Sequence, residues 1–207
     1  VWPLVSVIVY FAELLGTYAW GIIAVTIIIR LVILPLTIKQ VKSSKQMQEI
    51  QPKLKELQAK YSSKDAVTQQ QYQQEMMQLM QSSGVNPLAG CLPIFIQMPI
   101  LIGFYHAISR MNVTPAYDLG SFLGVHLAEP SILFAVLAGL MQLAVILTGP
   151  PIGDNPQMKM MMYIMPVMIV VFGAFLPAAL SLYWIVGNIF SIGQNFVIHK
   201  PWLNKKK

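Results

Sequence analysis

The run from Gly21 to Leu36 constrains the fold more than any other part of the chain, because it places a charged residue, Arg30, among mostly apolar side chains. A helix of about 20 apolar residues spans the hydrocarbon core of a bilayer. An ionised guanidinium at membrane depth costs about 2.5–3.5 kcal/mol even on the most lenient insertion scale. Arg30 precedes Lys39, the first lysine after the run, by nine residues, about 14 Å along a helix. At this depth the side chain would not easily reach the headgroups. The run predicts a transmembrane helix with a functional arginine, and a snorkelling arginine is the alternative.

No acidic residue lies where it could neutralise Arg30 within the membrane. The eight acids, all outside strongly apolar segments, are Glu13, Glu49, Glu56, Asp65, Glu75, Asp118, Glu129 and Asp154. Arg30 is therefore expected to face water, backbone carbonyls or a ligand that binds reversibly. Pro35 leaves one such carbonyl, that of Leu31, without its usual donor.

Composition places the whole chain among membrane proteins. It is 56% hydrophobic and 11% charged, whereas about a quarter of the residues in a soluble domain are charged. Hydropathy predicts an all-α, polytopic membrane protein with five transmembrane helices, at 17–38, 88–110, 131–148, 159–177 and 180–198. The remaining segments are an interfacial amphipathic helix at 1–16, a cytoplasmic helical hairpin at 39–87, an extracytoplasmic loop at 111–130, a cytoplasmic loop at 149–158 and a basic cytoplasmic tail at 199–207.

The distribution of lysine predicts the orientation. Lysines gather in 39–87, at Lys159 and in the tail, which share one side of a five-span chain, while the opposite side has only Arg110 at a helix end. By the positive-inside rule the N-terminus is outside and the C-terminus is cytoplasmic. The net charge of +6 then reflects lysines that anionic lipid attracts, which is a more economical reading than nucleic-acid binding.

The segment 39–87 carries two apolar stripes at helical spacing. They are Met47, Ile50, Leu54, Leu57 and Tyr61, then Tyr72, Met76, Leu79 and Met80. Ser62–Asp65 supplies a break between them, and Pro52 is expected to kink the first helix or to restart it. Two antiparallel helices fit this pattern. Their stripes either bury only each other or also offer a methionine-rich surface to partners.

Polar residues inside the predicted spans fall on helix faces. These faces are Thr26, Arg30 and Thr37 in the first span, Gln97 and Tyr105 in the second, Gln142 in the third, and Ser181, Trp184, Asn188, Ser191 and Asn195 in the fifth. One interpretation is hydrogen bonding that holds helices together. With an unpaired arginine nearby, we favour a partly hydrated groove, open to the cytoplasm and sideways to lipid. The candidate groove residues are Arg30, Thr26, Gln97, Gln142, Trp184, Asn188 and Ser191.

No motif indicates covalent chemistry. The three histidines are scattered, and the single cysteine, Cys91, excludes an internal disulfide. We therefore predict a protein that is not an enzyme, with no catalytic residue, no cofactor and no metal site.

Five motifs taken together resemble the YidC family of membrane protein insertases. They are Arg30-Leu31-Val32-Ile33-Leu34-Pro35-Leu36, Gln51-Pro52-Lys53-Leu54, Gly84-Val85-Asn86-Pro87-Leu88, Leu92-Pro93-Ile94-Phe95-Ile96-Gln97-Met98-Pro99 and Leu182-Tyr183-Trp184-Ile185-Val186-Gly187-Asn188. The resemblance covers nearly the whole chain and is similar to the Gram-positive type, which lacks the large extracytoplasmic domain. It implies five core helices, a cytoplasmic hairpin and a hydrophilic groove in the bacterial plasma membrane, with Arg30 as the groove arginine. The lipidated N-terminal cysteine usual in that type is absent here, so lipidation is left open.

The expected function is therefore that of an insertase and chaperone for small membrane proteins. The partners expected are nascent membrane proteins with short acidic or polar extracytoplasmic segments and the lipid bilayer, with the Sec translocon and the ribosome as further candidates. The alternative is a small-solute transporter with an intramembrane anion site at Arg30, although no internal repeat is visible. A structural assembly factor, whose polar stripes only join helices, is a third alternative.

Overall fold

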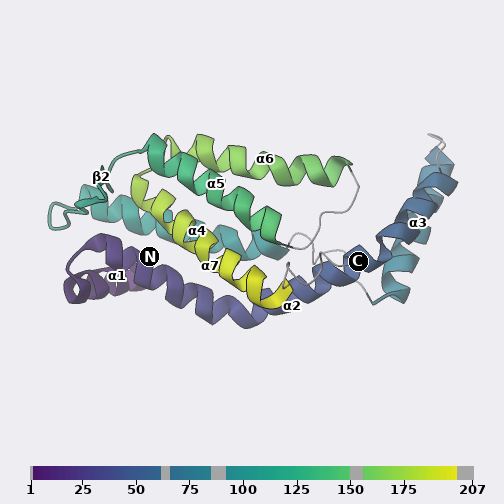
Figure 1. Ribbon diagram of the computed structural model, residues 1–207, viewed down its shortest axis with the longest axis horizontal. Coiled ribbons are helices and arrows are strands. Elements are labelled where there is room, and N and C mark those ends of the chain that lie inside the picture. The colour runs from purple at the N-terminus through teal and green to yellow at the C-terminus, as the bar shows by residue number, and fades with distance from the viewer. Residues whose placement is uncertain (1, 62–65, 85–91, 150–155, 200–207) are drawn as a thin grey trace.

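The computed structural model describes residues 2–61, 66–84, 92–149 and 156–199, which are almost entirely helical. The helices are α1 (Trp2–Leu15), α2 (Tyr18–Lys60), α3 (Ala66–Ser82), α4 (Leu92–Val113), α5 (Ile132–Thr148), α6 (Pro156–Gly173) and α7 (Ala178–His199). Two short strands, β1 (Ser121–Phe122) and β2 (Val125–His126), pair antiparallel between α4 and α5. Figure 1 shows an elongated bundle with α3 beyond one end and the strands at the other.

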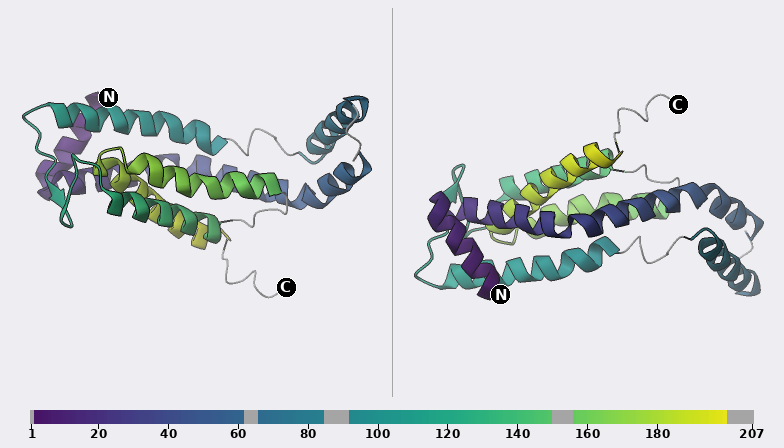
Figure 2. Two further views of the ribbon diagram at one scale, coloured as in Figure 1. Left: turned by 90° about the horizontal axis from the view of Figure 1, so that it is seen from above. Right: turned by 90° about the horizontal axis from the view of Figure 1, so that it is seen from below.

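The bundle is built around α7. α5 packs against both α6 and α7, and α7 also packs against α2. α1 crosses α2 and α4 at the end where the strands lie, and α3 packs on the last turns of α2 at the opposite end (Figure 2). The helices that would surround Arg30 are thus α2, α4 and α7.

The hydrophobic core lies in one half of this bundle, which we call the packed half. It comprises α1 together with 19–26 of α2, 104–111 of α4, 134–138 of α5 and 178–188 of α7, and Leu119, Leu127 and Ile169 also belong to this core. Phe104, Ala107, Ile108 and Met111 of α4 are all fully buried there. Small residues help: a Cβ atom at Gly21 would lie 2.5 Å from the Ile8 carbonyl oxygen of α1, so the two helices can approach this closely only with glycine.

The other half, which we call the loosely packed half, comprises 27–39 of α2, 95–103 of α4 and 189–199 of α7. No residue of these α2 and α4 segments is buried, and among the α7 residues whose burial is described Asn195 alone is buried. Val32 is 73% exposed and Phe95 is 69% exposed. Helix packing therefore falls away along the bundle axis, from the α1 end toward the α3 end.

The start of α7 is held by backbone hydrogen bonds from the loop before α5. The Ala178 and Ala179 N–H groups donate to the carbonyls of Glu129 (2.8 Å) and Leu127 (3.0 Å). These bonds satisfy donors that the first turn of a helix leaves unpaired. They fasten α7 at the packed end of the bundle.

The structure differs from the predicted segment bounds at α2. The predicted first span, 17–38, and the first arm of the predicted hairpin form one helix of 43 residues, despite Pro35 and Pro52 inside it. Proline removes one hydrogen bond but permits a bent helix to continue, and Figure 2 shows α2 bending before it reaches α3.

The sixth and seventh helices also differ slightly from their predicted bounds. α6 ends at Gly173 rather than 177, and α7 begins at Ala178 rather than 180. Pro177 explains both differences, because proline disfavours helix in the residue before it and suits the start of the next helix. The paired strands in 111–130 were not predicted.

The N-terminal helix is more deeply embedded than an interfacial position requires. Val5, Ile8 and Ala12 of α1 are buried against the rest of the packed half. Of the described helices, one segment, Tyr18–Ser43, with a mean hydropathy of 2.5, is long and apolar enough to cross a membrane. The prediction of five transmembrane helices is thus not tested by this measure and stays a prediction.

Several predicted features lie outside the described residues. They are the turn at 62–65, the motif at 85–88, Cys91 and, apart from the end of α7, the basic tail at 199–207.

Candidate functional site

Arg30 projects from α2 onto the backbone of α7. A Cβ atom at Gly187 would lie 2.5 Å from Arg30 Nη2, 3.1 Å from Nε and 3.2 Å from Cζ. The guanidinium therefore occupies the space that a side chain at position 187 would fill. Arg30 is partly buried, and among the described residues no carboxylate forms an ion pair with it.

A polar contact joins α4 to α7 one helical turn from Gly187. The Gln97 side-chain amide donates to the Tyr183 hydroxyl over 2.6 Å. The Tyr183 ring is buried and stacks on Phe104, with ring centroids 4.4 Å apart. Tyr183 precedes Gly187, where the Arg30 guanidinium lies, by one turn of α7. The boundary between the packed and loosely packed halves thus carries a guanidinium, an amide and a phenol from three helices.

Two predicted groove residues use their hydroxyl groups within their own helices. Thr26 is fully buried, and its Oγ1 donates to the Ile22 carbonyl over 2.6 Å. Ser191 Oγ donates to the Gly187 carbonyl over 3.0 Å. Such bonds to the preceding turn satisfy a hydroxyl in an apolar setting, so neither group needs an external partner.

Asn188 and Gln142 make their polar contacts with neighbouring helices. Asn188 is buried and donates to the Ala138 carbonyl of α5 over 3.3 Å. Gln142 Nε2 lies 4.0 Å from the Met165 sulfur of α6. Trp184 is 9% exposed and belongs to the hydrophobic core. For Asn188 the geometry favours the interhelical hydrogen bond over the groove.

The structure thus brings Arg30 and Gln97 together with two residues absent from the predicted site, Tyr183 and Gly187. Tyr183 belongs to the motif Leu182–Asn188, but it does not fall on the polar helix face predicted for the fifth span, which includes Trp184 instead. Gly187 could have been singled out from the sequence, because a glycine inside a helical pattern often has a packing reason, such as the close approach of another group.

A separate cavity of about 260 Å³ lies at the α1 end of the molecule, away from Arg30. It is lined by Trp2, Val5, Ser6, Val9, Tyr10, Glu13 and Tyr117. None of these residues belongs to the predicted site.

The sequence matches the model of the family described as 60Kd inner membrane protein over residues 10–206. It is 54% identical over 211 residues to the membrane protein insertase MisCA of Bacillus subtilis, covering 99% of this chain and 79% of that protein. It is 52% identical over 197 residues to the membrane protein insertase YidC of Oceanobacillus iheyensis, covering 91% and 77%.

The fold is similar to that in an active YidC insertase crystal structure with the first transmembrane domain resolved. The TM-score is 0.74 and the sequence identity 27%, over 94% of this chain and 45% of that one. The resemblance inferred from the five motifs is therefore confirmed.

Proposed function

Because this chain belongs to the 60Kd inner membrane protein family, which includes the YidC insertases, we propose that it is a membrane protein insertase whose hydrophilic groove contains Arg30. The relatives reported above are named insertases, not enzymes or transporters, which is consistent with a role without enzymatic turnover. The substrates are membrane proteins, and the site of action is the lipid bilayer of the plasma membrane.

The observation that carries the groove is the position of Arg30. A guanidinium within the apolar segment Tyr18–Ser43 has no carboxylate partner among the described residues and lies where helix packing ends. A charge in such a place is stable when water or a substrate anion reaches it. The groove floor that we propose is Arg30, Gln97 and the Tyr183 hydroxyl, and Thr26, Gln142, Trp184, Asn188 and Ser191 support it from neighbouring positions.

In this mechanism an acidic or polar segment of the substrate enters the groove and meets Arg30, while its apolar segment leaves sideways into lipid. The buried residues of α4 lie at 104–111, whereas none of 95–103 is buried, so the earlier part of α4 would leave a path on one side. No nucleotide-binding motif is present in the sequence, so burial of substrate apolar surface in lipid supplies the free energy. The Sec translocon and the ribosome are candidate partners.

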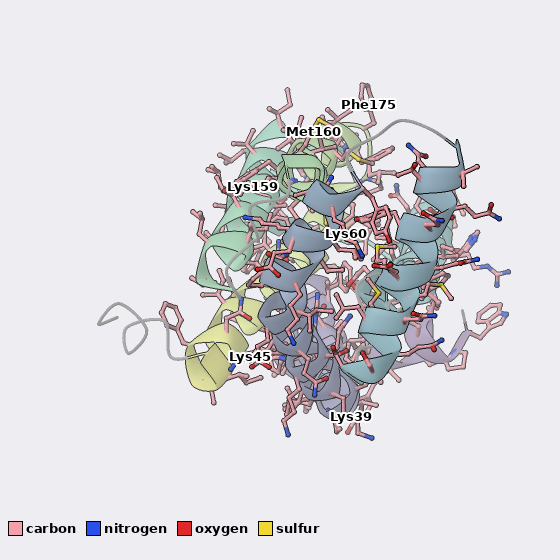
Figure 3. The ribbon with its side chains drawn as sticks, turned by 90° about the vertical axis from the view of Figure 1, so that its right-hand side faces the viewer. Lys39, Lys45, Lys60, Lys159, Met160 and Phe175 are labelled. Carbon is pink, nitrogen blue, oxygen red and sulfur yellow. The ribbon has the colours of Figure 1, made fainter. Side chains whose placement is uncertain are left out.

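The topology that we propose has α2, α4, α5, α6 and α7 as membrane-crossing helices, with the N-terminus outside. Figure 3 looks onto the α3 end of the molecule, where Lys39, Lys45 and Lys60 of α2 are labelled. This lysine-bearing end would be cytoplasmic. The last part of α2 and the α3 helix packed against it would then form the cytoplasmic hairpin. α1 would lie near the outer face of the membrane.

Reconstitution into liposomes with a small single-span substrate tests the proposal. Insertion should fall strongly in Arg30→Ala, fall further in Arg30→Glu and persist in part in Arg30→Lys, since lysine keeps the charge but not the shape of the guanidinium. Full insertion by Arg30→Glu would remove the electrostatic role of the groove.

A further inference from the structure

Gly187 stands in the middle of α7, where the backbone gives no reason for glycine. α7 is helical from Ala178 to His199, and Gly187 is not among the described glycines with positive φ. Glycine inside a helix is less stable than alanine, because the unfolded chain loses more freedom on ordering. The missing side chain must therefore be explained by what occupies its place.

The occupant is the guanidinium of Arg30. All three atoms nearest to a Cβ at position 187 belong to Arg30, at 2.5 Å, 3.1 Å and 3.2 Å. Carbon and nitrogen atoms in contact are normally about 3.5–4.0 Å apart. Any side chain at this position would force the guanidinium to move.

We infer that Gly187 is a positioning residue that seats the Arg30 guanidinium against the backbone of α7, an inference that rests on the proposed role of Arg30. The seat fixes the depth of the positive charge beside Tyr183, one helical turn away. It thereby sets where along the groove a polar or acidic substrate segment is met. Without the seat, the charged end of this long side chain would be free to turn away from α7.

Other glycines of the bundle distinguish a positioning role from ordinary packing. A Cβ at Gly173 would lie 2.9 Å from Ala135 Cβ and 3.0 Å from Ser181 Oγ, which are short and rigidly held. At Gly187 the obstructing atoms are the far end of a flexible side chain, so Gly187→Ala should keep the fold and displace Arg30. Gly193, on the same helix, has no atom within 4 Å of a Cβ and provides the matched control.

Arginine modification reads the position of the guanidinium without any insertion assay. The chain has two arginines, Arg30 and Arg110, so Arg110 is an internal standard for phenylglyoxal labelling of the reconstituted protein. Gly187→Ala should raise the ratio of Arg30 to Arg110 modification, measured by mass spectrometry. Gly193→Ala should leave the ratio at the wild-type value, and so should Gly173→Ala, although it lowers the melting temperature. An unchanged or lower ratio in Gly187→Ala would overturn the inference.

A double-mutant cycle then asks whether Gly187 acts through Arg30. Gly187→Ala should reduce insertion in the wild-type background and reduce it less in the Arg30→Lys background, because lysine lacks Nη2, the closest obstructing atom. Equal fractional losses in both backgrounds would show that Gly187 acts through the fold alone, and the inference would fail. If Arg30→Ala inserts normally, the proposed function of Arg30 fails, while the labelling ratio still decides whether Gly187 seats it.

Discussion

α2, α4 and α7 run through both halves of the bundle, but the two halves are packed by different means. In the packed half, alanine and glycine let backbones approach, and α1 closes the end. In the loosely packed half, α2 and α4 turn large apolar side chains such as Val32 and Phe95 outward. Since lipid is as apolar as these side chains, helix association needs close packing or hydrogen bonds rather than hydrophobicity alone.

The difference between the two halves indicates where in this bundle a charged side chain can be accommodated within the membrane. Arg30 follows Thr26, the last fully buried residue of this part of α2, by one helical turn. The packed half lies on one side of the guanidinium, and in the function proposed above the loosely packed half gives substrates access to it. A tightly packed support beside a loosely packed wall would suit the proposed substrates, which must enter and leave.

Core truncation should show the largest contrast between the halves. Phe104→Ala removes the ring stacked on Tyr183 and should lower the free energy of unfolding by about 3 kcal/mol. This is the low end for a buried phenylalanine, because between helices in lipid the loss of packing contacts counts and the hydrophobic effect does not. Phe95→Ala, on the same helix but exposed, should change it by less than about 0.5 kcal/mol. Unfolding in detergent measures both, and equal effects would mean that the halves are packed alike.

Removing the acceptor that joins α4 to α7 should have a smaller effect. Tyr183→Phe keeps the stacking on Phe104 but loses the hydrogen bond from Gln97, so about 1 kcal/mol of stability should be lost. Gln97→Met should cost a similar amount, and the double variant no more than either single variant. Additive losses would show that the two side chains do not act as a pair.

The hairpin should contribute little to the bundle. Ile50 and Met80, with Leu54 and Met76 against them, form a cluster separate from the main core. Replacing residues 43–84 with a short flexible linker should therefore change the stability of the packed half by less than about 0.5 kcal/mol, while hydrogen exchange over 45–82 should exceed that of the bundle helices. Failure of this variant to accumulate in membranes would make the hairpin a folding element.

The smallest expected effect is a pH response at the end of that hairpin. The Tyr61 hydroxyl and Lys60 both hydrogen-bond Glu75. The Tyr61 bond and then Lys60 lower the pKa of Glu75 below 4.5, while bonds to Tyr61 and Glu75 raise the pKa of Lys60 above 10.5. Because the pKa of the Glu75 carboxyl is lowered in the folded state, its ionised form stabilises that state at pH values above the unfolded pKa. This stabilisation is lost as pH falls through the folded-state pKa. The raised pKa of Lys60 has the opposite pH dependence: its stabilisation is present below the unfolded pKa and is lost as pH rises through the folded pKa.

The α2–α3 contact should therefore be tightest between about pH 5 and pH 10, because both partners are then charged. A spin-label distance between the two helices, followed down to pH 3, should lengthen in the wild type and show no such acid transition in Glu75→Gln. An identical transition in both proteins would assign the response to other groups.

The mostly helical fold was predicted from the sequence, whereas the orientation of polar side chains was not. Apolar periodicity and proline indicated helix in the stretches that the structure shows as helical, but they did not indicate the continuity of α2 through Pro35 and Pro52. Stripe geometry grouped Thr26 and Asn188 with Arg30, but Thr26 bonds its own helix and Asn188 bonds α5. A helical face has more than one neighbour, and sequence spacing does not say which one a side chain meets. Gly187 has no side chain to contribute to a stripe, so its role appears only when α2 is placed beside it.

Cysteine accessibility tests the central claim most directly, that the groove begins where packing ends. In a Cys91→Ser background, Arg30→Cys and Gln97→Cys should react with a membrane-impermeant thiol reagent added from the cytoplasmic side. Thr26→Cys, one turn from Arg30 and fully buried, should be protected, as should Asn188→Cys. Equal reactivity of Thr26→Cys and Arg30→Cys, or no reaction at either Arg30→Cys or Gln97→Cys, would contradict the account.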